Sequence, residues 1–434
     1  MKSSSRAYTW VPSLYFAEAL PYMAVIFMST TLYTRMGLSN TELAFYTSWL
    51  YLPWVIKPLW SPFVDAIKTK RWWVIAMQTL LGAGFAGIAF TLNTSFWLSA
   101  SLAFFWLIAF SSATHDIAAD GFYILALDSH EQSLYVGIRS TFYRIGNIFV
   151  QGAMVILAGF LEKHLVSNNL PNIPAAWAIT FGTLAAIILL LAVYHHFRLP
   201  HVEAQPETVA ETEQGNMLWQ VLRQFGQTVK TFFTKPQIIP ALLFMLLFRF
   251  PEAQLGKITT PFLLDTYEHG GLALSTASVG TIYGVVGVVG LLLGGILGGI
   301  LVAKDGLKRW LWPMVAAISI PDAVYILLSA TQTSNLWLIN SCVFLEQFGY
   351  GFGFTAYMLY LIYFSRGESS TSVYALCTAF MALGMMLPGM MAGWLADTLG
   401  YTNFFIAVLV FTAITFLVTA FLRIDPDFGK KGHE

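Results

Sequence analysis

The sequence predicts an all-α integral membrane protein that crosses the bilayer twelve times, in two sets of six spans. Hydrophobic residues make up 57% of the 434 residues and charged residues only 11%, against about 25% charged in a typical soluble domain. Apolar windows long enough to cross about 30 Å of hydrocarbon recur along the whole chain. They lie at 11–33, 42–64, 72–92, 96–126, 134–160 and 175–197, then at 236–264, 275–303, 310–330, 336–364, 371–396 and 402–423.

The loop charges set the expected orientation. All Lys and Arg residues between the windows except Arg35 and Lys163 fall on the side of the N-terminus. Because cytoplasmic loops carry the excess of cations, both termini are expected in the cytoplasm. Glu18 interrupts the first apolar window and no small-residue cleavage site follows it, so we interpret this window as a retained span.

Composition also excludes several classes of function. The net charge is zero, so no basic surface indicates nucleic acid. Cys342 and Cys377 both lie in apolar runs, which excludes a disulfide framework and a thiolate metal site. The sequence has no phosphate-binding loop and no common hydrolase motif, so we expect neither ATP-driven transport nor an enzyme. No cofactor and no metal are expected.

The spans divide the chain into three parts. We expect an N-terminal six-helix lobe over 1–197, a cytoplasmic linker over 198–235 and a C-terminal six-helix lobe over 236–434. The linker begins acidic and continues with an amphipathic pattern from Met217. An amphipathic helix on the inner leaflet is the first interpretation, and a regulatory docking helix is the second.

The two lobes repeat weakly. The tripeptide Lys-Arg-Trp occurs at 70–72 and again at 308–310, and Gly146 corresponds to Gly384 at the same shift. Two parallel six-helix repeats joined by a cytoplasmic linker resemble the plan of the major-facilitator transporters.

The loop between spans two and three resembles a signature of that superfamily, in which an acid is followed by a basic pair. Here these residues are Asp65, Lys70 and Arg71. An acid beside cations at a helix end can bind the end of a neighbouring helix and latch one conformation. The alternative is an ordinary cytoplasmic loop with an isolated aspartate.

Charged residues inside the spans are the strongest functional signal, because each costs about 2.5–3.5 kcal/mol near a helix centre. The acids and bases are nearly balanced, which favours internal ion pairs, and a purely structural pair is an open alternative for each residue. The acids are Glu18, Asp116, Asp120, Glu252, Asp322 and Glu346, and the bases are Lys57, Arg139, Arg144, Arg249 and Lys257.

Depth along each span, at about 1.5 Å per residue, separates these charges into two groups. The first is a cytoplasmic-side charge cluster or gate around two aspartates at i and i+4: Lys57, Asp116, Asp120, Arg139 and Arg144. The second is a midplane cavity that binds substrate or couples protons: Glu18, Arg249, Glu252 and Glu346. Asp322 receives no functional role, and His115 is expected to pack or hydrogen-bond between helices.

In the major-facilitator plan that the two repeats resemble, spans one, four, seven and ten line the cavity, and here each of them carries an acid. A carboxylate that binds a proton on one side of the membrane and releases it when a cation approaches is sufficient for proton symport. We therefore expect energy from an ion gradient or from the gradient of the substrate itself.

Several stretches resemble the AmpG-like muropeptide permease family, the peptide, acetyl-coenzyme A and drug transporter branch of the major facilitator superfamily. They are Phe16–Pro21, Lys57–Asp65, Phe110–Asp120, Tyr143–Gly146, Phe344–Glu346 and Gly389–Trp394. The resemblance implies a proton-coupled importer of anhydro-amino-sugar peptides, acting as a monomer in the bacterial inner membrane during peptidoglycan recycling. Its expected partners are a small-molecule substrate, protons and the lipid bilayer.

Two other hypotheses stay open. The cations inside the membrane would also suit another organic anion, such as a siderophore-like chelator, an acyl-coenzyme A or an oligosaccharide cargo. A transporter-like fold that senses wall fragments without moving them is the third possibility.

Overall fold

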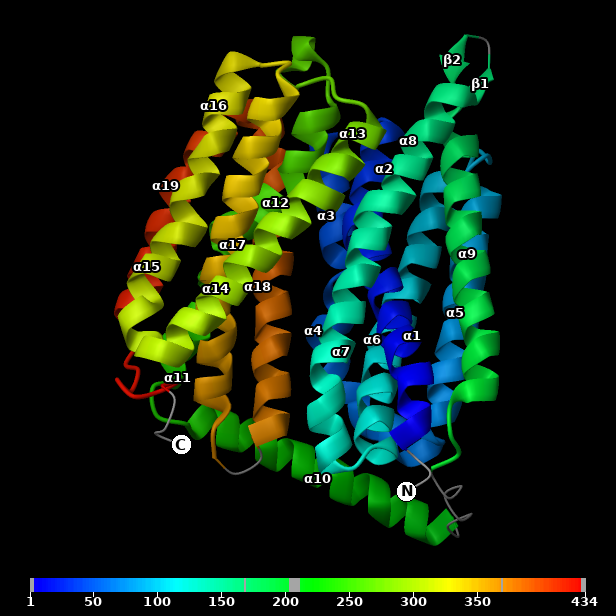
Figure 1. Cartoon of the computed structure of the whole chain (residues 1–434), viewed down its shortest axis with the longest axis vertical. Coiled ribbons are helices and arrows are strands. Elements are labelled where there is room, and N and C mark those ends of the chain that lie inside the picture. Colours follow the sequence, from blue (N-terminus) through cyan, green and yellow to red (C-terminus); the bar gives the residue numbers. More distant parts are fainter. Residues whose placement is uncertain (1–3, 168, 203–210, 368–369, 431–434) are drawn as a thin grey trace. The chain divides into compact units, whose positions relative to one another are not determined.

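A computed structural model describes residues 4–167, 169–202, 211–367 and 370–430 (Figure 1). The chain forms two compact units, of which unit 1 comprises Met1–Leu32 with Ile56–Gly226 and unit 2 comprises Tyr33–Val55 with Gln227–Glu434. The segment Tyr33–Val55 thus belongs to unit 2, although it precedes most of unit 1 in the sequence.

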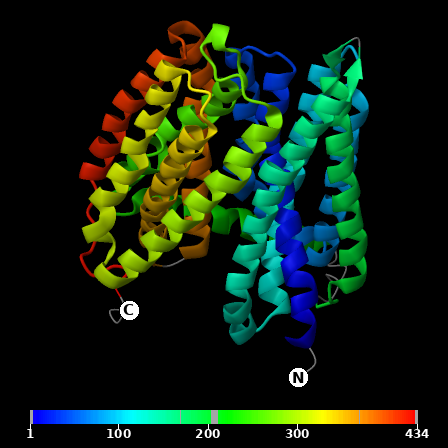
Figure 2. The ribbon, with the colours of Figure 1, turned by 45° about the horizontal axis from the view of Figure 1, so that its top comes forward.

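The first part of the chain is helical apart from one short hairpin. Its helices are α1 (Ser4–Met23), η1 (Ala24–Met28), α2 (Ser29–Arg35), α3 (Asn40–Trp49), α4 (Leu52–Ile67), α5 (Lys70–Thr91), α6 (Trp97–Ala126), α7 (Ser129–Ile148), η2 (Phe149–Met154), α8 (Val155–His164) and α9 (Ile173–Arg198). The hairpin strands β1 (Val166–Ser167) and β2 (Leu170–Pro171) pair antiparallel, with Val166 opposite Pro171. They project beyond the ends of α8 and α9 (Figures 1 and 2).

The described remainder is also helical. It contains α10 (Glu211–Thr234), α11 (Ile238–Leu247), α12 (Phe250–Leu264), η3 (Tyr267–His269), α13 (Thr276–Thr281), η4 (Ile282–Gly287), α14 (Val288–Asp305), α15 (Leu307–Ser319), η5 (Ile320–Asp322), α16 (Ala323–Thr331), α17 (Leu336–Ser365), α18 (Ser370–Leu399) and α19 (Tyr401–Ala420).

Every predicted window coincides with helix, so the predicted all-α membrane fold is confirmed. Among the described residues, 10 helical segments are long and apolar enough to cross a membrane. The other two predicted windows hold α17, whose 30 residues include Glu346, and the pair α3 and α4.

Two spans of unit 2 are broken at prolines. In the seventh span α11 ends at Leu247 and α12 begins at Phe250, next to Pro251, which has no N–H to continue the helical ladder. Side chains of neighbouring helices satisfy carbonyls near the break: the Tyr357 hydroxyl donates to Met245 O at 2.6 Å, and the Thr415 hydroxyl donates to Phe248 O at 2.9 Å. In the ninth span η5, which contains Pro321, separates α15 from α16.

Glycines of α17 let the broken ninth span approach closely. A Cβ atom at Gly349 would lie 2.0 Å from Ala317 O, and one at Gly353 would lie 2.6 Å from Met314 O. These obstacles are backbone atoms, which cannot move aside as a side-chain tip can. The small residues therefore fix the distance between α15 and α17.

Replacing Gly349 with Ala is expected to destabilise unit 2, because the added methyl group forces α15 away from α17. Overpacking of this kind costs about 1–3 kcal/mol. Thermal unfolding in detergent should show a lower melting temperature for Gly349→Ala than for Gly299→Ala in α14, where a Cβ meets nothing within 4 Å. Equal melting temperatures would contradict this packing argument.

Candidate functional site

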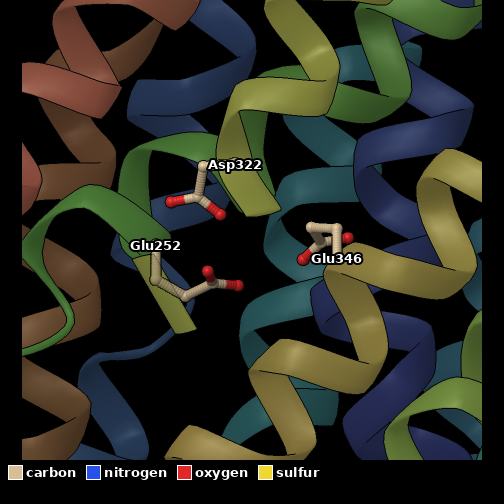
Figure 3. Close-up of side chains that lie close together, drawn as sticks. All are labelled: Glu252, Asp322 and Glu346. Carbon is tan, nitrogen blue, oxygen red and sulfur yellow. The ribbon is translucent and has the colours of Figure 1, made fainter. Parts of the chain in front are cut away.

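Three carboxylates converge in the interior of unit 2. Oxygens of Glu252, Asp322 and Glu346 all lie within 4.8 Å of one another. Figure 3 shows the three side chains directed toward one common space from three different elements. Asp322 and Glu346 are only 2% and 3% exposed, and the Oε2 atom of Glu252 is buried although the residue as a whole is half-buried. We call this group the acidic triad.

The breaks in the helices position two of the three acids. Glu252 lies in the first turn of α12, directly after Pro251, and Asp322 ends η5, directly after Pro321. Glu346 lies within the continuous helix α17. At each break, the residue directly after the proline is an acid whose carboxylate points into the interior of unit 2. Interrupted spans are the usual source of ligand-binding groups in the centre of transporters.

The hydrogen bonds within the acidic triad are unevenly distributed. Glu346 accepts from the Tyr325 hydroxyl at 3.2 Å and from Gln347 Nε2 at 3.0 and 3.1 Å, and Tyr325 in turn bonds the hydroxyl of Tyr283 at 2.8 Å. By contrast, Asp322 Oδ1 and Glu252 Oε2 are buried without a hydrogen-bond partner among the described residues. Two oxygens that face one space are therefore available to a proton or a ligand.

This geometry limits the charge that the acidic triad can hold. Three carboxylates so close together in a buried site repel one another, so they are not all ionised without a compensating positive charge. Either bound protons or a cation with a preference for oxygen ligands meets that requirement. The site is therefore chemically suited to bind and release small cations.

Two cations of unit 2 lie on the same helix as Glu252 or at its start. Arg249, which precedes α12 and is 8% exposed, donates to the Tyr350 hydroxyl and lies 4.8 Å from the ring centre of Phe354. Its Nε atom is buried and has no hydrogen-bond partner in the part of the chain that the structure describes. Lys257 donates to the Thr47 hydroxyl at 3.0 Å. The Arg249 guanidinium thus retains one unused donor beside the acidic triad, at i−3 from Glu252.

The structure brings only part of the predicted midplane group together. Glu252 and Glu346 meet, Arg249 lies within electrostatic range of Glu252, and Asp322 completes the group although the sequence assigned it no role. Glu18 belongs to unit 1, where it lies within electrostatic range of Asp120 and Asp116. A signal for Asp322 exists in the sequence, because Pro-Asp in the ninth span matches Pro-Glu in the seventh.

Unit 1 holds the second group of charges. Arg139 Nη2 lies 2.8 Å from Asp120 Oδ1, and Lys57 Nζ lies 3.5 Å from Asp116 Oδ2. The Tyr15 hydroxyl donates to Asp120 Oδ1 at 3.2 Å, and the Arg139 guanidinium lies 4.4 Å from the centre of the Tyr15 ring. Helices α1, α4, α6 and α7 are thereby joined by ion pairs and hydrogen bonds.

Arg144 does not join this group. Its side chain is exposed and makes no ion pair with any side chain that the structure describes. Arg139 and Arg144 are five residues apart, which places them about 140° apart around an α-helix, so only one of them can face Asp120. The predicted cluster of five residues is therefore observed as four, with Tyr15 and Glu18 beside them.

The predicted loop latch is described in part. Arg71 donates to Leu199 O at 3.1 Å and also to His196 O, so it binds the C-terminal end of α9, where free carbonyls favour a cation. Lys70 is buried, and its side chain packs against Gly121 of α6. The side chain of Asp65 lies outside the described part of the structure.

His115 belongs to a buried chain of hydrogen bonds in unit 1. Its Nε2 lies 3.0 Å from Gln78 Nε2, Gln78 Oε1 lies 2.9 Å from His195 Nδ1, and His195 Nε2 lies 2.9 Å from Ser13 Oγ. The chain joins α6, α5, α9 and α1. This arrangement corresponds to the predicted interhelical hydrogen-bonding role.

Replacing Asp120 with Asn is expected to change exchange kinetics more than stability. The side chains of Arg139 and Asp120 are 29% and 45% exposed, and ion pairs this accessible contribute less than about 1 kcal/mol. Thermal unfolding and substrate counterflow should be measured on the same preparation, with a nearly unchanged melting temperature and altered counterflow expected. If the variant exchanges substrate normally but cannot concentrate it, Asp120 takes part in coupling rather than in gating.

Comparisons with known proteins agree with this architecture. The family model of the Major Facilitator Superfamily matches residues 13–387. The anhydromuropeptide permease of Escherichia coli (strain K12) is 27% identical over 399 residues, which cover 90% of this chain and 74% of that protein. Putative transporter AmpG 4 of Rickettsia felis is 24% identical over 92% of this chain and 93% of its own length.

Solved structures show the same fold. A D-xylose–proton symporter superposes with a TM-score of 0.70 at 14% identity, covering 98% of this chain and 99% of its own. A proton-dependent oligopeptide transporter gives a TM-score of 0.67 at 15% identity, covering 96% and 99%. The predicted resemblance to AmpG-like transporters is confirmed, and this multi-pass membrane transporter belongs to the Major Facilitator Superfamily.

Proposed function

We propose that this transporter imports peptidoglycan-derived muropeptides, anhydro-amino-sugar peptides, by proton-coupled alternating access. The observation that carries the proposal is the acidic triad, in which two buried oxygens have no partner among the described residues. The cargo class is supported by the similarity to the anhydromuropeptide permease. In this proposal the chain lies in the bacterial inner membrane as a monomer, with both termini in the cytoplasm.

The acidic triad is proposed to hold the coupled protons. With a proton bound, the group carries less negative charge and tolerates burial in a closed, occluded state. When the site opens to the cytoplasm and hydrates, the repulsion between the carboxylates favours loss of the proton. Binding on the outer side and release on the inner side then link the inward proton gradient to the movement of the substrate.

Arg249 is proposed to bind a carboxylate of the muropeptide. Its guanidinium lies against Phe354 and Tyr350, and its Nε donor has no partner among the residues whose positions are described. A substrate carboxylate placed there approaches Glu252, which lies three residues further along the chain. Because the two negative charges repel, substrate binding and protonation of Glu252 favour each other. Substrate and proton thus bind cooperatively at neighbouring groups.

The charge cluster of unit 1 is proposed to act in gating. Lys57, Asp116, Asp120 and Arg139 form ion pairs that are partly exposed. Pairs of this kind contribute little to stability, so their opening and closing is compatible with rapid conformational exchange. The latch residues Asp65, Lys70 and Arg71 are proposed to stabilise one of the two conformations.

Uptake into proteoliposomes tests the cargo. Purified protein should take up anhydro-muropeptide, and unlabelled muropeptide should compete with it whereas unrelated organic anions should not. Efficient uptake of a siderophore-like chelator or an acyl-coenzyme A in place of the muropeptide would support the alternative cargo, for which Arg249 and Lys257 provide equally suitable cations. Indifference to the muropeptide would contradict the proposed cargo.

A further inference from the structure

A basic pocket lies where α14 meets α15, at the start of α15, whereas Asp322 of the acidic triad follows the end of that helix. It has a volume of about 450 Å³ and is widely open at the surface. The residues that line it come from the end of α14, the start of α15 and the C-terminal segment: Lys304, Asp305, Lys308, Arg309, Pro426 and Lys430. Four of these six residues are cations.

The C-terminal segment forms one wall of the basic pocket and is held firmly in place. The Phe428 side chain is 5% exposed, lies 4.9 Å from the ring centre of Tyr363 and packs under the Arg366 guanidinium at 4.4 Å. Leu307 N donates to Phe428 O at 3.0 Å. These contacts fix the position of Lys430, two residues further along the chain.

Gly306 makes the close approach of the two walls possible. It adopts φ +87°, in the left-handed region that favours glycine. A Cβ atom at this position would lie 2.9 Å from Pro426 O and 3.2 Å from Lys430 Cε. The tight turn between α14 and α15 therefore allows the C-terminal segment to reach the start of α15.

The basic pocket has positive charge that its own acids do not neutralise. Asp305 lies 3.2 Å from Arg309 and accepts from Trp310 Nε1 at 3.0 Å, and Asp427 lies 2.7 Å from Lys430. Lys304 and Lys308 are exposed and make no ion pair with any side chain that the structure describes. The local formal charge is therefore positive, with two ammonium groups available to a ligand.

The start of α15 adds to this positive field. The helix spans 13 residues, and no side chain caps its N-terminus. The N–H of Leu307 donates to Phe428 O, but no side chain of the described residues binds the N–H groups that follow it, and such groups, together with the helix dipole, favour a phosphate or another anion. A concave pocket, two unpaired lysines and an uncapped helix start thus point to the same ligand chemistry.

We propose that the basic pocket binds a phosphate group, supplied by the headgroup of an anionic phospholipid. The pocket lies where two candidate membrane spans meet, Thr276–Asp305 and Leu307–Thr331, and the ends of spans are where headgroups are expected. Trp312, which is 46% exposed, lies on the first turns of α15, and tryptophan is typical of the membrane–water interface. Basic pockets between spans bind lipid phosphates in this way. Free inorganic phosphate offers the same chemistry and is the competing source.

Thermal unfolding of the purified full-length protein in detergent tests this site, with titration of phosphatidylglycerol, phosphatidylcholine or inorganic phosphate. The wild type should be stabilised by phosphatidylglycerol but not by phosphatidylcholine. The double variant Lys304→Gln/Lys308→Gln should need roughly thirtyfold more phosphatidylglycerol, since each of the two lysines near an anionic headgroup contributes about 1 kcal/mol. The charge-matched control Lys68→Gln/Lys163→Gln, at two exposed positions of unit 1, should respond as the wild type does.

Equal stabilisation of the wild type and of the Lys304→Gln/Lys308→Gln variant by phosphatidylglycerol would overturn the proposed site. Equal stabilisation by inorganic phosphate and by phosphatidylglycerol would overturn the lipid as its source. Native mass spectrometry provides a second readout, in which the wild type should retain one anionic phospholipid more often than the variant. None of these measurements depends on transport, so their outcome is independent of the proposed cargo and coupling ion.

Discussion

Replacing Glu346 with Gln is expected to convert concentrative uptake into simple equilibration. Gln is nearly isosteric and can still accept a hydrogen bond from Tyr325, which lies 3.2 Å from the carboxylate, but it cannot bind and release a proton. A pH difference of one unit supplies about 1.4 kcal/mol per proton, enough for about tenfold accumulation. The accumulation ratio of labelled muropeptide in proteoliposomes should therefore fall to about one, while counterflow continues.

The control for this prediction is Glu268→Gln, which changes an exposed glutamate of η3 in the same unit. It should accumulate muropeptide as the wild type does. Asp322→Asn should resemble Glu346→Gln, because both acids belong to the acidic triad. If Glu346→Gln accumulates muropeptide as the wild type does and has a normal melting temperature, Glu346 does not take part in proton coupling.

Replacing Arg249 with Gln is expected to weaken muropeptide binding by roughly 10- to 100-fold, since a hydrogen bond to a charged group contributes about 1.5–3 kcal/mol. The half-saturating concentration for counterflow measures this effect. Arg249→Lys should recover only part of the affinity, because an ammonium group cannot pair with a carboxylate through two parallel bonds. A muropeptide whose carboxylates are converted to amides provides the matched control.

The amidated substrate should be exchanged equally by wild type and Arg249→Gln, because it has no negative charge for the guanidinium to bind. If Arg249→Gln weakens the binding of the amidated muropeptide and of the native muropeptide to the same extent, Arg249 has a structural role in unit 2. Tyr350→Phe separates these roles further, since it removes the hydroxyl to which Arg249 donates but retains the ring.

The membrane fold could be predicted from hydropathy because each span must cover the same thickness of hydrocarbon. Depth along the spans also placed Glu252 and Glu346 at the same level, and the structure brings them together. Depth gives only the position along the membrane normal. It does not give the neighbours of a side chain at that level, such as Asp116 and Asp120 beside Glu18 in unit 1.

Asp322 shows what hydropathy and depth leave undetermined. The ninth span is peripheral in the expected plan, so its acid received no role. The direction of the side chain depends on the break at Pro321 and on the close approach of α15 to α17 that Gly349 permits. The break has a local cause, whereas the close approach is a consequence of packing between two helices. The proline directly before each buried acid of the broken spans was the available local signal.

The choice between Arg139 and Arg144 depended on rotation about one helix. Both arginines lie on α7, and both were predicted to join the charge cluster around the aspartates of α6. Five residues correspond to about 140° of rotation, so the two side chains diverge. Arg139 pairs with Asp120, whereas Arg144 is exposed. Helical periodicity alone shows that the two differ, but the packing of α7 decides which one faces inward.

Proton movement driven by the substrate tests the central claim most directly. Sodium-free proteoliposomes that enclose a pH-sensitive dye should be given anhydro-muropeptide from outside at equal pH on both sides. Wild-type protein should acidify the interior as muropeptide enters, the rate should fall as the external pH rises, and Glu346→Gln should take up muropeptide without acidification. Muropeptide uptake by the wild type with no change in internal pH, or uptake that requires sodium, would contradict proton coupling at the acidic triad.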